Sequence, residues 1–156
     1  MSSPVASPTA KVLFRVAESD GSANVETLWA FDLGADRYKL DNSPFYAYGV
    51  SWGDTVFAPH DEAEGRPTFR SVLSKSGHRT VRVIFDPPVA SGNKSDAVLQ
   101  GLVRLGCEYE GANPGYIVVS IPPNVELGSV VQYLIEHEAN WEHADPTYEQ
   151  YNANDA

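Results

Sequence analysis

The sequence lacks the features that identify a membrane protein or a disulfide-stabilised secreted protein. Its 156 residues include a single cysteine, Cys107, so no disulfide bond can form within the chain, as is typical of a reducing compartment. No apolar run approaches the roughly 20 residues that a membrane-spanning helix requires. Residues 1–10 have neither the basic start nor the apolar centre of a secretion signal. We therefore expect a cytoplasmic protein that binds no membrane and begins with a disordered tail over residues 1–10.

Positive charge is scarce in the second half of the chain. Residues 86–156 contain only Lys94 and Arg104 against eleven acidic residues, whereas residues 1–85 contain nine basic and ten acidic residues. This half accounts for most of the net charge of −10, and its field would repel the phosphates of a nucleic acid. We expect no nucleic-acid binding. The excess of acid predicts either a basic protein partner or simply good solubility.

Common catalytic, nucleotide and metal motifs are also missing. There is no G-K-[ST] phosphate loop, and neither Ser76 nor Cys107 lies in a G-x-S-x-G elbow. His137 and His143 are six residues apart, whereas a zinc-binding helix needs histidines four apart to share a face. We therefore predict no cofactor and no metal site, and we interpret Cys107 as a small buried apolar residue.

The first half alternates as β-structure does. In residues 25–33 the alternate side chains, from Val25 through Trp29 to Leu33, fall on one face of a strand. Several short strands separated by Gly, Asp and Pro predict a small β-barrel or rolled antiparallel sheet over residues 11–76. The strands expected there are residues 11–18, 25–33, 37–40, 55–58 and 68–74.

The second half changes rhythm and predicts an α+β fold for the whole chain. Its pattern is β-α-β-β-α-β, the ferredoxin-like order, over residues 77–147, with a flexible tail at 148–156. Ser95 is expected to cap the first helix and Gly106 to end it. The helices would cover one face of the sheet, and the first half would cover the other face or an edge. The elements expected are strands 80–85, 107–110, 116–121 and 141–145, and helices 95–106 and 125–140.

Residues 42–52 form an aromatic segment that is read as a structured loop. A long loop in a small domain often carries function. One interpretation is that its aromatic side chains line a ligand cleft or anchor a protein interface. The other is that they plug the open end of the barrel. The aromatic residues concerned are Phe45, Tyr46, Tyr48 and Trp52.

The stretch SGHRTVR, residues 76–82, also has two interpretations. Free N–H groups around Gly77, helped by His78 or Arg79, would form an anion-binding nest, and His78 could act in acid–base chemistry. Alternatively, Gly77 is a hinge between the halves, Asp54 caps its own turn, and Arg82 pairs with a carboxylate or stacks on an aromatic ring. The hinge is the simpler interpretation, because one histidine and one aspartate in a β-rich chain are a weak catalytic signal.

Three segments together resemble a known bacterial family. They are E-T-L-W-A at residues 26–30, Y-x-L-x-N-x-P-F-x-x-x-G-x-x-x-G-D-x-V at 38–56, and S-G-H-x-T-x-R at 76–82. The combination is similar to the family of domains of unknown function numbered 4265, over about residues 11–150. The resemblance implies no catalytic role. It implies one shared structural neighbourhood for Trp29, Asn42, Pro44, Asp54, Gly77 and Arg82.

Two hypotheses of function follow. The first is a non-catalytic binding protein, such as an immunity-type or regulatory partner of a basic protein, and the sequence favours it over an enzyme. The second is a small enzyme that uses His78 and Asp54 for acid–base or hydrolytic chemistry on an anionic small molecule, in a cleft between the halves. The residues expected to bind are Trp29, Asn42, Phe45, Tyr48, Trp52, Gly77, Arg79, Arg82, Glu138 and Glu142.

Overall fold

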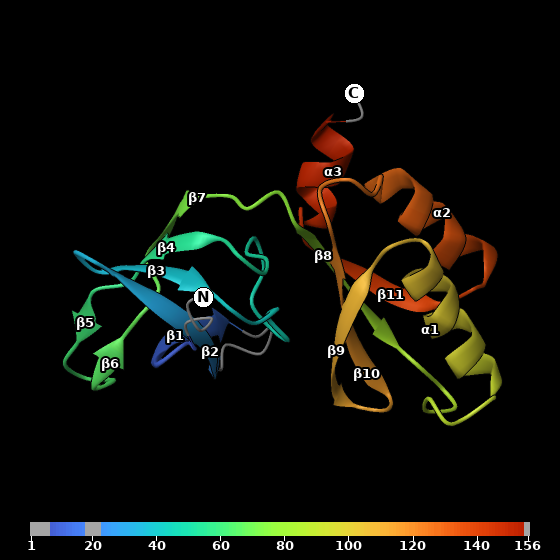
Figure 1. The fold of residues 1–156 in the computed structure, drawn as a ribbon, viewed down its shortest axis with the longest axis horizontal. Coiled ribbons are helices and arrows are strands. Elements are labelled where there is room, and N and C mark those ends of the chain that lie inside the picture. The colour runs from blue at the N-terminus through green and yellow to red at the C-terminus, as the bar shows by residue number, and fades with distance from the viewer. Residues whose placement is uncertain (1–6, 18–22, 155–156) are drawn as a thin grey trace, which may run out of the picture.

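The computed structural model describes residues 7–17 and 23–154, so most of the expected N-terminal tail and the end of the strand expected at 11–18 lie outside the described residues. It has a mixed α+β architecture with mostly antiparallel sheets, of which one is strongly curled (Figure 1). The chain builds this curled sheet first and a helix-covered sheet second, and each sheet has its own apolar core.

The first sheet is a half-barrel of five antiparallel strands in the order β1-β2-β3-β4-β7. It curls because the chain after the β5–β6 hairpin returns to the first strand, where the Phe69 N–H donates to the Leu13 carbonyl at 2.8 Å. The strands are β1 (Ala10–Ala17), β2 (Ala23–Gly34), β3 (Arg37–Leu40), β4 (Thr55–Phe57), β5 (His60–Asp61), β6 (Arg66–Pro67) and β7 (Ser71–Ser74).

Strand β2 shows why alternation alone does not say which face is buried. The predicted shared face exists, but it faces outward, since Val25 is 56% exposed and Trp29 42% exposed. The buried face carries Leu28 and Ala30 instead, which pack with the other strands into the core of the half-barrel. On the outward face the Lys11 ammonium lies 4.5 Å from the Trp29 ring centre, so the aromatic ring is partly covered by a basic side chain.

The second sheet has four antiparallel strands in the order β11-β8-β10-β9. Its core face carries Val81 and Val83 of β8, and side chains of α1 and α2 pack against these residues. The two helices therefore cover one face of the sheet (Figure 1). The elements are β8 (Arg79–Ile84), α1 (Lys94–Arg104), β9 (Glu108–Asn113), β10 (Tyr116–Ile121), α2 (Leu127–Glu136), β11 (Asn140–Asp145) and α3 (Tyr148–Asn154).

The start of α1 differs from expectation, whereas its end agrees with it. The cap of α1 is Asn93, whose side chain accepts the Asp96 N–H at 2.8 Å, and not Ser95, which is buried and donates to the Pro87 carbonyl. Asparagine caps as well as serine does, so the sequence offers two competing caps here. Gly106, with φ of +107°, follows the helix end as predicted.

Helix α3 lies where the sequence analysis expects a tail. Its start is a reciprocal capping box, in which the Gln150 N–H donates to the Thr147 hydroxyl at 3.3 Å and the Thr147 N–H donates to the Gln150 side chain at 2.9 Å. The Tyr151 ring of α3 stacks on His143 of β11 at 4.7 Å, which holds the helix against the sheet. The signal that could have predicted α3 is T-x-x-Q at residues 147–150.

The first half covers part of the other face of the second sheet, where Ile84 remains 50% exposed. Val118 is fully buried there and Arg82 is 2% exposed, although neither belongs to the helix-covered core. The covering segment is the connection between β3 and β4, residues 41–54, which we call the seam loop. Its backbone bonds directly to the far strand, since the Gly49 N–H donates to the Ala144 carbonyl at 2.8 Å.

Candidate functional site

Arg82 is the largest fully buried side chain and holds the seam loop against the second sheet. Its guanidinium donates to the carbonyls of Pro44, Tyr46 and Ala47 in the seam loop. It also pairs with Glu142 at 3.2 Å. A guanidinium has five donors in a fixed fork, so one side chain can tie several carbonyls and a carboxylate together.

The Arg82 guanidinium also lies 4.9 Å from the Tyr48 ring centre. The Tyr48 hydroxyl donates to both carboxylate oxygens of Glu142, at 3.1 and 2.9 Å. Both interactions that the sequence suggested for Arg82, a carboxylate and an aromatic ring, therefore occur together. Burial, followed by the hydrogen bond to Glu142, raises the pKa of Tyr48, so its phenol remains protonated at neutral pH.

The aromatic side chains of the seam loop face the second half. The rings of Phe45 and Tyr46 lie 6.4 and 6.1 Å from the Tyr116 ring of β10, and Trp52 makes an edge contact with His78 at 4.8 Å. The small residues of the loop belong instead to the half-barrel core, as Ala47 and Val50 do. The loop therefore closes the half-barrel with its small apolar residues and joins the halves with its aromatic ones.

The seam loop also has a set of backbone N–H groups that could bind an anion, and a carboxylate of the protein already accepts from them. The carboxylate of Glu26, on β2, accepts the N–H groups of Phe45, Tyr46 and Ala47 at 2.9, 3.1 and 2.7 Å. Nearby, the Asn42 side chain accepts the Trp29 N–H at 2.8 Å. Sequence reasoning did not assign a role to Glu26, and the only available signal was its position in the E-T-L-W-A motif.

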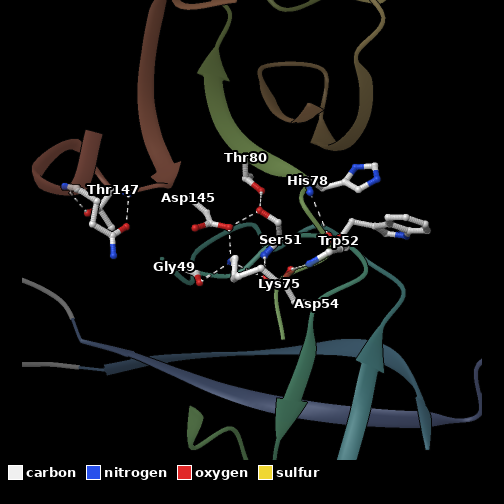
Figure 2. Close-up of polar contacts among 11 residues, drawn as sticks. Gly49, Ser51, Trp52, Asp54, Lys75, His78, Thr80, Asp145 and Thr147 are labelled. Atoms are coloured by element: carbon white, nitrogen blue, oxygen red, sulfur yellow. Dashed lines mark hydrogen bonds and ion pairs between the residues drawn. The ribbon is translucent and has the colours of Figure 1, made fainter. Parts of the chain in front are cut away.

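A charged cluster ties the seam loop, the β7–β8 connection and the end of β11 together (Figure 2). The Lys75 ammonium contacts carboxylate oxygens of Asp54 and Asp145, each at 2.6 Å. Asp54 is fully buried and Asp145 is 6% exposed, so the cluster places two buried carboxylates around one cation. The Ser51 hydroxyl donates to Asp145 at 2.6 Å and lies 2.7 Å from the Thr80 hydroxyl oxygen.

The protonation of Lys75 reflects two opposing effects. Burial lowers its pKa, but hydrogen bonds and charge attraction from Asp145 and Asp54 outweigh this, and the pKa is raised above its ordinary value. The ammonium is therefore charged at neutral pH. This arrangement stabilises a fixed orientation of the halves and does not provide a neutral amine for nucleophilic chemistry.

The geometry of SGHRTVR supports the hinge interpretation. Gly77 has φ of +94°, and a Cβ at this position would lie 2.9 Å from Pro123 Cγ, so the bend requires glycine. The Ser76 N–H donates to Asp54 at 2.8 Å and the His78 N–H donates to the Ser76 hydroxyl at 3.1 Å. These backbone donors are thus engaged within the chain. Arg79 donates to the Pro122 and Val125 carbonyls ahead of α2.

His78 and Asp54 have different hydrogen-bond partners. The bonds of Asp54 go to Lys75, Ser51 and Ser76, whereas His78 Nδ1 lies 3.2 Å from the Ser120 hydroxyl. The His78 and Trp52 side chains point away from the charged cluster (Figure 2). A small cleft of about 170 Å³ lies on their side of the seam, and it is lined by Ser43, Trp52, Glu108, Tyr109, Glu110 and Ser120.

A larger cavity lies at the opposite edge of the second sheet. It is an open groove of about 630 Å³, which we call the acidic aromatic groove. Its residues come from the seam loop, β11 and the start of α3. They are Tyr48, Trp141, Glu142, His143, Thr147, Tyr148 and Glu149.

His143 lies at the centre of this aromatic cluster. Its ring is 4.7 Å from Trp141, 4.7 Å from Tyr151 and 6.0 Å from Tyr148. The residue is 8% exposed, and its Nδ1 atom is buried without a hydrogen-bond partner in the part of the chain described. Burial lowers the pKa of His143, so the imidazole is neutral at pH 7.

Glu138 does not share this groove with Glu142. It follows α2 with φ of +53° and lines a separate, smaller cavity of about 150 Å³ that also contains Lys94. Of the residues predicted to bind, Tyr48, Arg82 and Glu142 contact one another. Asn42 bonds to Trp29, and Trp52 contacts His78. Arg79 and Glu138 lie elsewhere. Tyr148 and Glu149 were missed, because their segment was expected to be a tail.

Other expectations concern features away from the groove. Burial raises the pKa of Cys107 to about 11, as suits a small apolar core residue and not a nucleophile. Among the described residues no three histidine, cysteine or acidic side chains gather as a metal site. No helix in the described ranges is long and apolar enough to cross a membrane.

Comparisons with known proteins agree with this architecture. The fold is similar to that of a hypothetical protein from Neisseria gonorrhoeae solved by crystallography, with a TM-score of 0.75 and 14% sequence identity over 89% of this chain and 96% of that one. No curated protein sequence matches the chain. The family model described as a domain of unknown function, DUF4265, matches residues 26–144, which include the seam loop, the hinge and β11. The chain therefore belongs to the DUF4265 family.

Proposed function

We propose that this protein is a non-catalytic binding protein whose acidic aromatic groove receives a basic protein partner. The observation that carries the proposal is the composition of the groove, where Tyr48, Trp141 and Tyr148 stand beside the carboxylates of Glu142 and Glu149. Protein interfaces are anchored by aromatic residues in preformed hollows, and opposite charge speeds association. The excess of eleven acidic over two basic residues in positions 86–156 suits a basic partner.

The groove is preorganised, which favours binding over a structural role alone. Tyr48 is fixed by Arg82 and Glu142, and His143 is fixed between Trp141 and Tyr151. Tyr148 is 64% exposed, although it is a large aromatic residue on an ordered helix. Side chains held in place before binding lose little conformational entropy when a partner docks.

The second function considered, an enzyme acting through His78 and Asp54, has less support. The two side chains have different partners, and the cleft beside His78 is small. The groove residues instead suit an immunity-type or regulatory role, in which charge steers the encounter and aromatic side chains anchor it. With one cysteine and no disulfide, the cytoplasm is the compartment proposed.

The proposal includes a ferredoxin-like second half, residues 77–147. The element order β8-α1-β9-β10-α2-β11 and the sheet order β11-β8-β10-β9 support it. In this arrangement β11 is an edge strand, and the residues that follow it, at the start of α3, lie beside that edge. The groove is therefore a feature of the edge of this unit, completed by Tyr48 from the other half.

Affinity capture from the native cell tests the proposal, with wild type compared with Glu149→Lys and with Glu126→Lys. Both residues are exposed, but only Glu149 lines the groove. We expect wild type and Glu126→Lys to retain a basic protein that Glu149→Lys loses, and His78→Ala to retain it as well. Equal capture by all variants, or loss with His78→Ala alone, would contradict the proposal. Glu142 is a poorer test residue, because its reversal also leaves Arg82 unpaired.

A further inference from the structure

Tyr48 and Glu142 already bind one guanidinium, that of Arg82. The ring lies 4.9 Å from the Arg82 guanidinium carbon, and the carboxylate pairs with Arg82 at 3.2 Å. The same two side chains line the acidic aromatic groove, and Arg82 does not. Within the protein itself, the Tyr48 ring and the Glu142 carboxylate together therefore bind a guanidinium group.

We propose that the acidic aromatic groove binds one arginine side chain of a protein partner, with the guanidinium placed among Tyr48, Trp141 and Tyr148 and facing Glu149. This deepens the proposed function, on which it rests, by naming the group that is recognised. Arginine suits such a site better than lysine, because its planar, weakly hydrated head stacks on aromatic faces and pairs with carboxylates through two donors.

The charges of the groove leave one carboxylate for the incoming cation. Glu142 is engaged by Arg82 and Tyr48, and its side chain is 47% exposed, so it contributes acceptor oxygens but little uncompensated charge. The Glu149 carboxylate forms no hydrogen bond or ion pair with the other described residues, and the residue is exposed at the start of α3. Glu149 is therefore the counter-ion that the proposal assigns to the bound arginine.

His143 supplies a second, independent feature. Its ring lines the groove, the residue is more than nine-tenths buried, and its Nδ1 atom has no partner among the described residues. A buried ring nitrogen without a hydrogen bond costs free energy, and a ligand donor would recover it where the His143 ring turns to expose this nitrogen, which has almost no accessible surface in the unbound protein. Because the imidazole is neutral, it can accept from a guanidinium N–H without repelling the charge.

Three short peptides test the proposal: acetyl-Ala-Arg-Ala-amide, the same peptide with lysine, and the same peptide with citrulline, which has the shape of arginine and no charge. Binding is followed by two-dimensional proton–nitrogen NMR on the full chain. We expect the arginine peptide to shift the Trp141 indole signal saturably, with a dissociation constant on the order of 1 mM, as suits one anchoring side chain. The citrulline peptide should bind about tenfold more weakly, because it lacks the cation–π and ion-pair contributions.

Two exposed positions provide the variants. Glu149→Gln and Tyr148→Ala should each lower the affinity for the arginine peptide about fivefold or more. Glu126→Gln, at the residue that precedes α2, should leave this affinity unchanged. Equal affinity for arginine and citrulline peptides would overturn the proposal, and so would saturable shifts confined to residues outside the groove. Absence of any saturable shift in wild type would overturn it too.

The outcome separates this inference from the proposed function. If a basic partner is captured and Glu149→Lys releases it, but the three peptides bind alike, the binding function stands and the arginine site is wrong. If the arginine peptide binds as expected and no basic partner is captured, the site stands and the proposed function is wrong.

Discussion

The Tyr48 hydroxyl donates to the Glu142 carboxylate at 2.9 Å, across the seam between two sheets and 94 positions of the chain. Arg82 lies against both residues, so the seam loop, β8 and β11 meet at one buried guanidinium. The groove proposed to bind a partner exists only because this meeting places Tyr48 beside β11. Stability of the seam and competence of the groove should therefore be linked.

Replacing Arg82 should be among the most destabilising single changes in the protein. Arg82→Ala leaves three carbonyls of the seam loop and the Glu142 carboxylate without their partner. We expect the free energy of unfolding in urea to fall by about 3–5 kcal/mol, because buried carbonyls lose their donor and the deleted side chain leaves a cavity. Arg70→Ala, at a 60% exposed side chain, is the control and should cost less than about 1 kcal/mol. A similar small cost for both would mean that Arg82 does not hold the seam.

Lys75 should be needed because of the two carboxylates around it. Lys75→Met leaves Asp54 and Asp145 buried without their cation and should lower the free energy of unfolding by about 3 kcal/mol. Adding Asp145→Asn removes one of the two negative charges, so the double variant should be more stable than Lys75→Met alone. Thermal and urea unfolding measure both. If the second substitution adds a further loss of the same size, charge balance is not the reason that Lys75 matters.

The seam could be predicted from the sequence in outline and not in detail. Alternation of Val81, Arg82 and Val83 places the two valines on one face of β8 and the arginine on the other, but it does not say that the second face is covered. Three of the partners of Arg82 are backbone carbonyls, which carry no side-chain signal, so no pattern could name them. The family resemblance grouped Trp29, Asn42, Pro44, Asp54, Gly77 and Arg82, and hydrogen bonds join several of these positions: the Trp29 N–H donates to Asn42, Arg82 donates to the Pro44 carbonyl, and the Ser76 N–H next to Gly77 donates to Asp54.

The groove was harder to predict, for a different physical reason. Glu142 was identified as an acidic binding residue, but its counterpart Glu149 sits on α3, a helix of only 7 residues. So short a helix has little intrinsic stability and depends on the capping box at Thr147 and on the contact between Tyr151 and His143. Periodicity is weak over so few residues, and tertiary contacts decide the outcome. The orientation of Trp29 was missed similarly, because an alternating strand does not show which face meets the core.

Gly77 should tolerate no side chain. Its φ of +94° is strained for an L-residue, and a Cβ would meet Pro123 Cγ at 2.9 Å. We expect Gly77→Ala to lower the free energy of unfolding by about 2 kcal/mol or more. Gly92→Ala is the matched control: its φ is +75°, but the space around it is open, so it should show the backbone cost alone, about 1 kcal/mol. Equal losses of unfolding free energy at the two positions would show that the contact with Pro123 does not contribute to the cost of a side chain at position 77.

Acidification should destabilise the protein through His143. Burial lowers the pKa of His143 in the folded state, whereas the unfolded chain has the ordinary value of about 6.5. Below that pH the unfolded state binds a proton that the folded state resists, so stability falls as pH decreases, by at most about 1.4 kcal/mol per pH unit for this group. Above about pH 7 His143 is neutral in both the folded and the unfolded state, so it contributes no pH dependence to the stability.

The measurement is urea unfolding between about pH 5 and 8, the range around the ordinary histidine pKa. The loss of stability between pH 7 and pH 5 should be smaller in His143→Phe than in wild type, whereas His60→Gln, at an exposed position, should keep the wild-type profile. Parallel profiles for wild type and His143→Phe would show that the imidazole is not the group responsible.

The salt dependence of partner binding tests the central claim most directly. For a basic partner obtained by capture, the dissociation constant is measured over a series of salt concentrations for wild type, Glu149→Gln and Glu126→Gln. The account predicts that Glu149→Gln weakens binding and flattens the dependence on salt, because one ion pair is lost from the interface, while Glu126→Gln follows wild type. Identical curves for all three proteins would contradict it, since the groove would then contribute no charge to recognition.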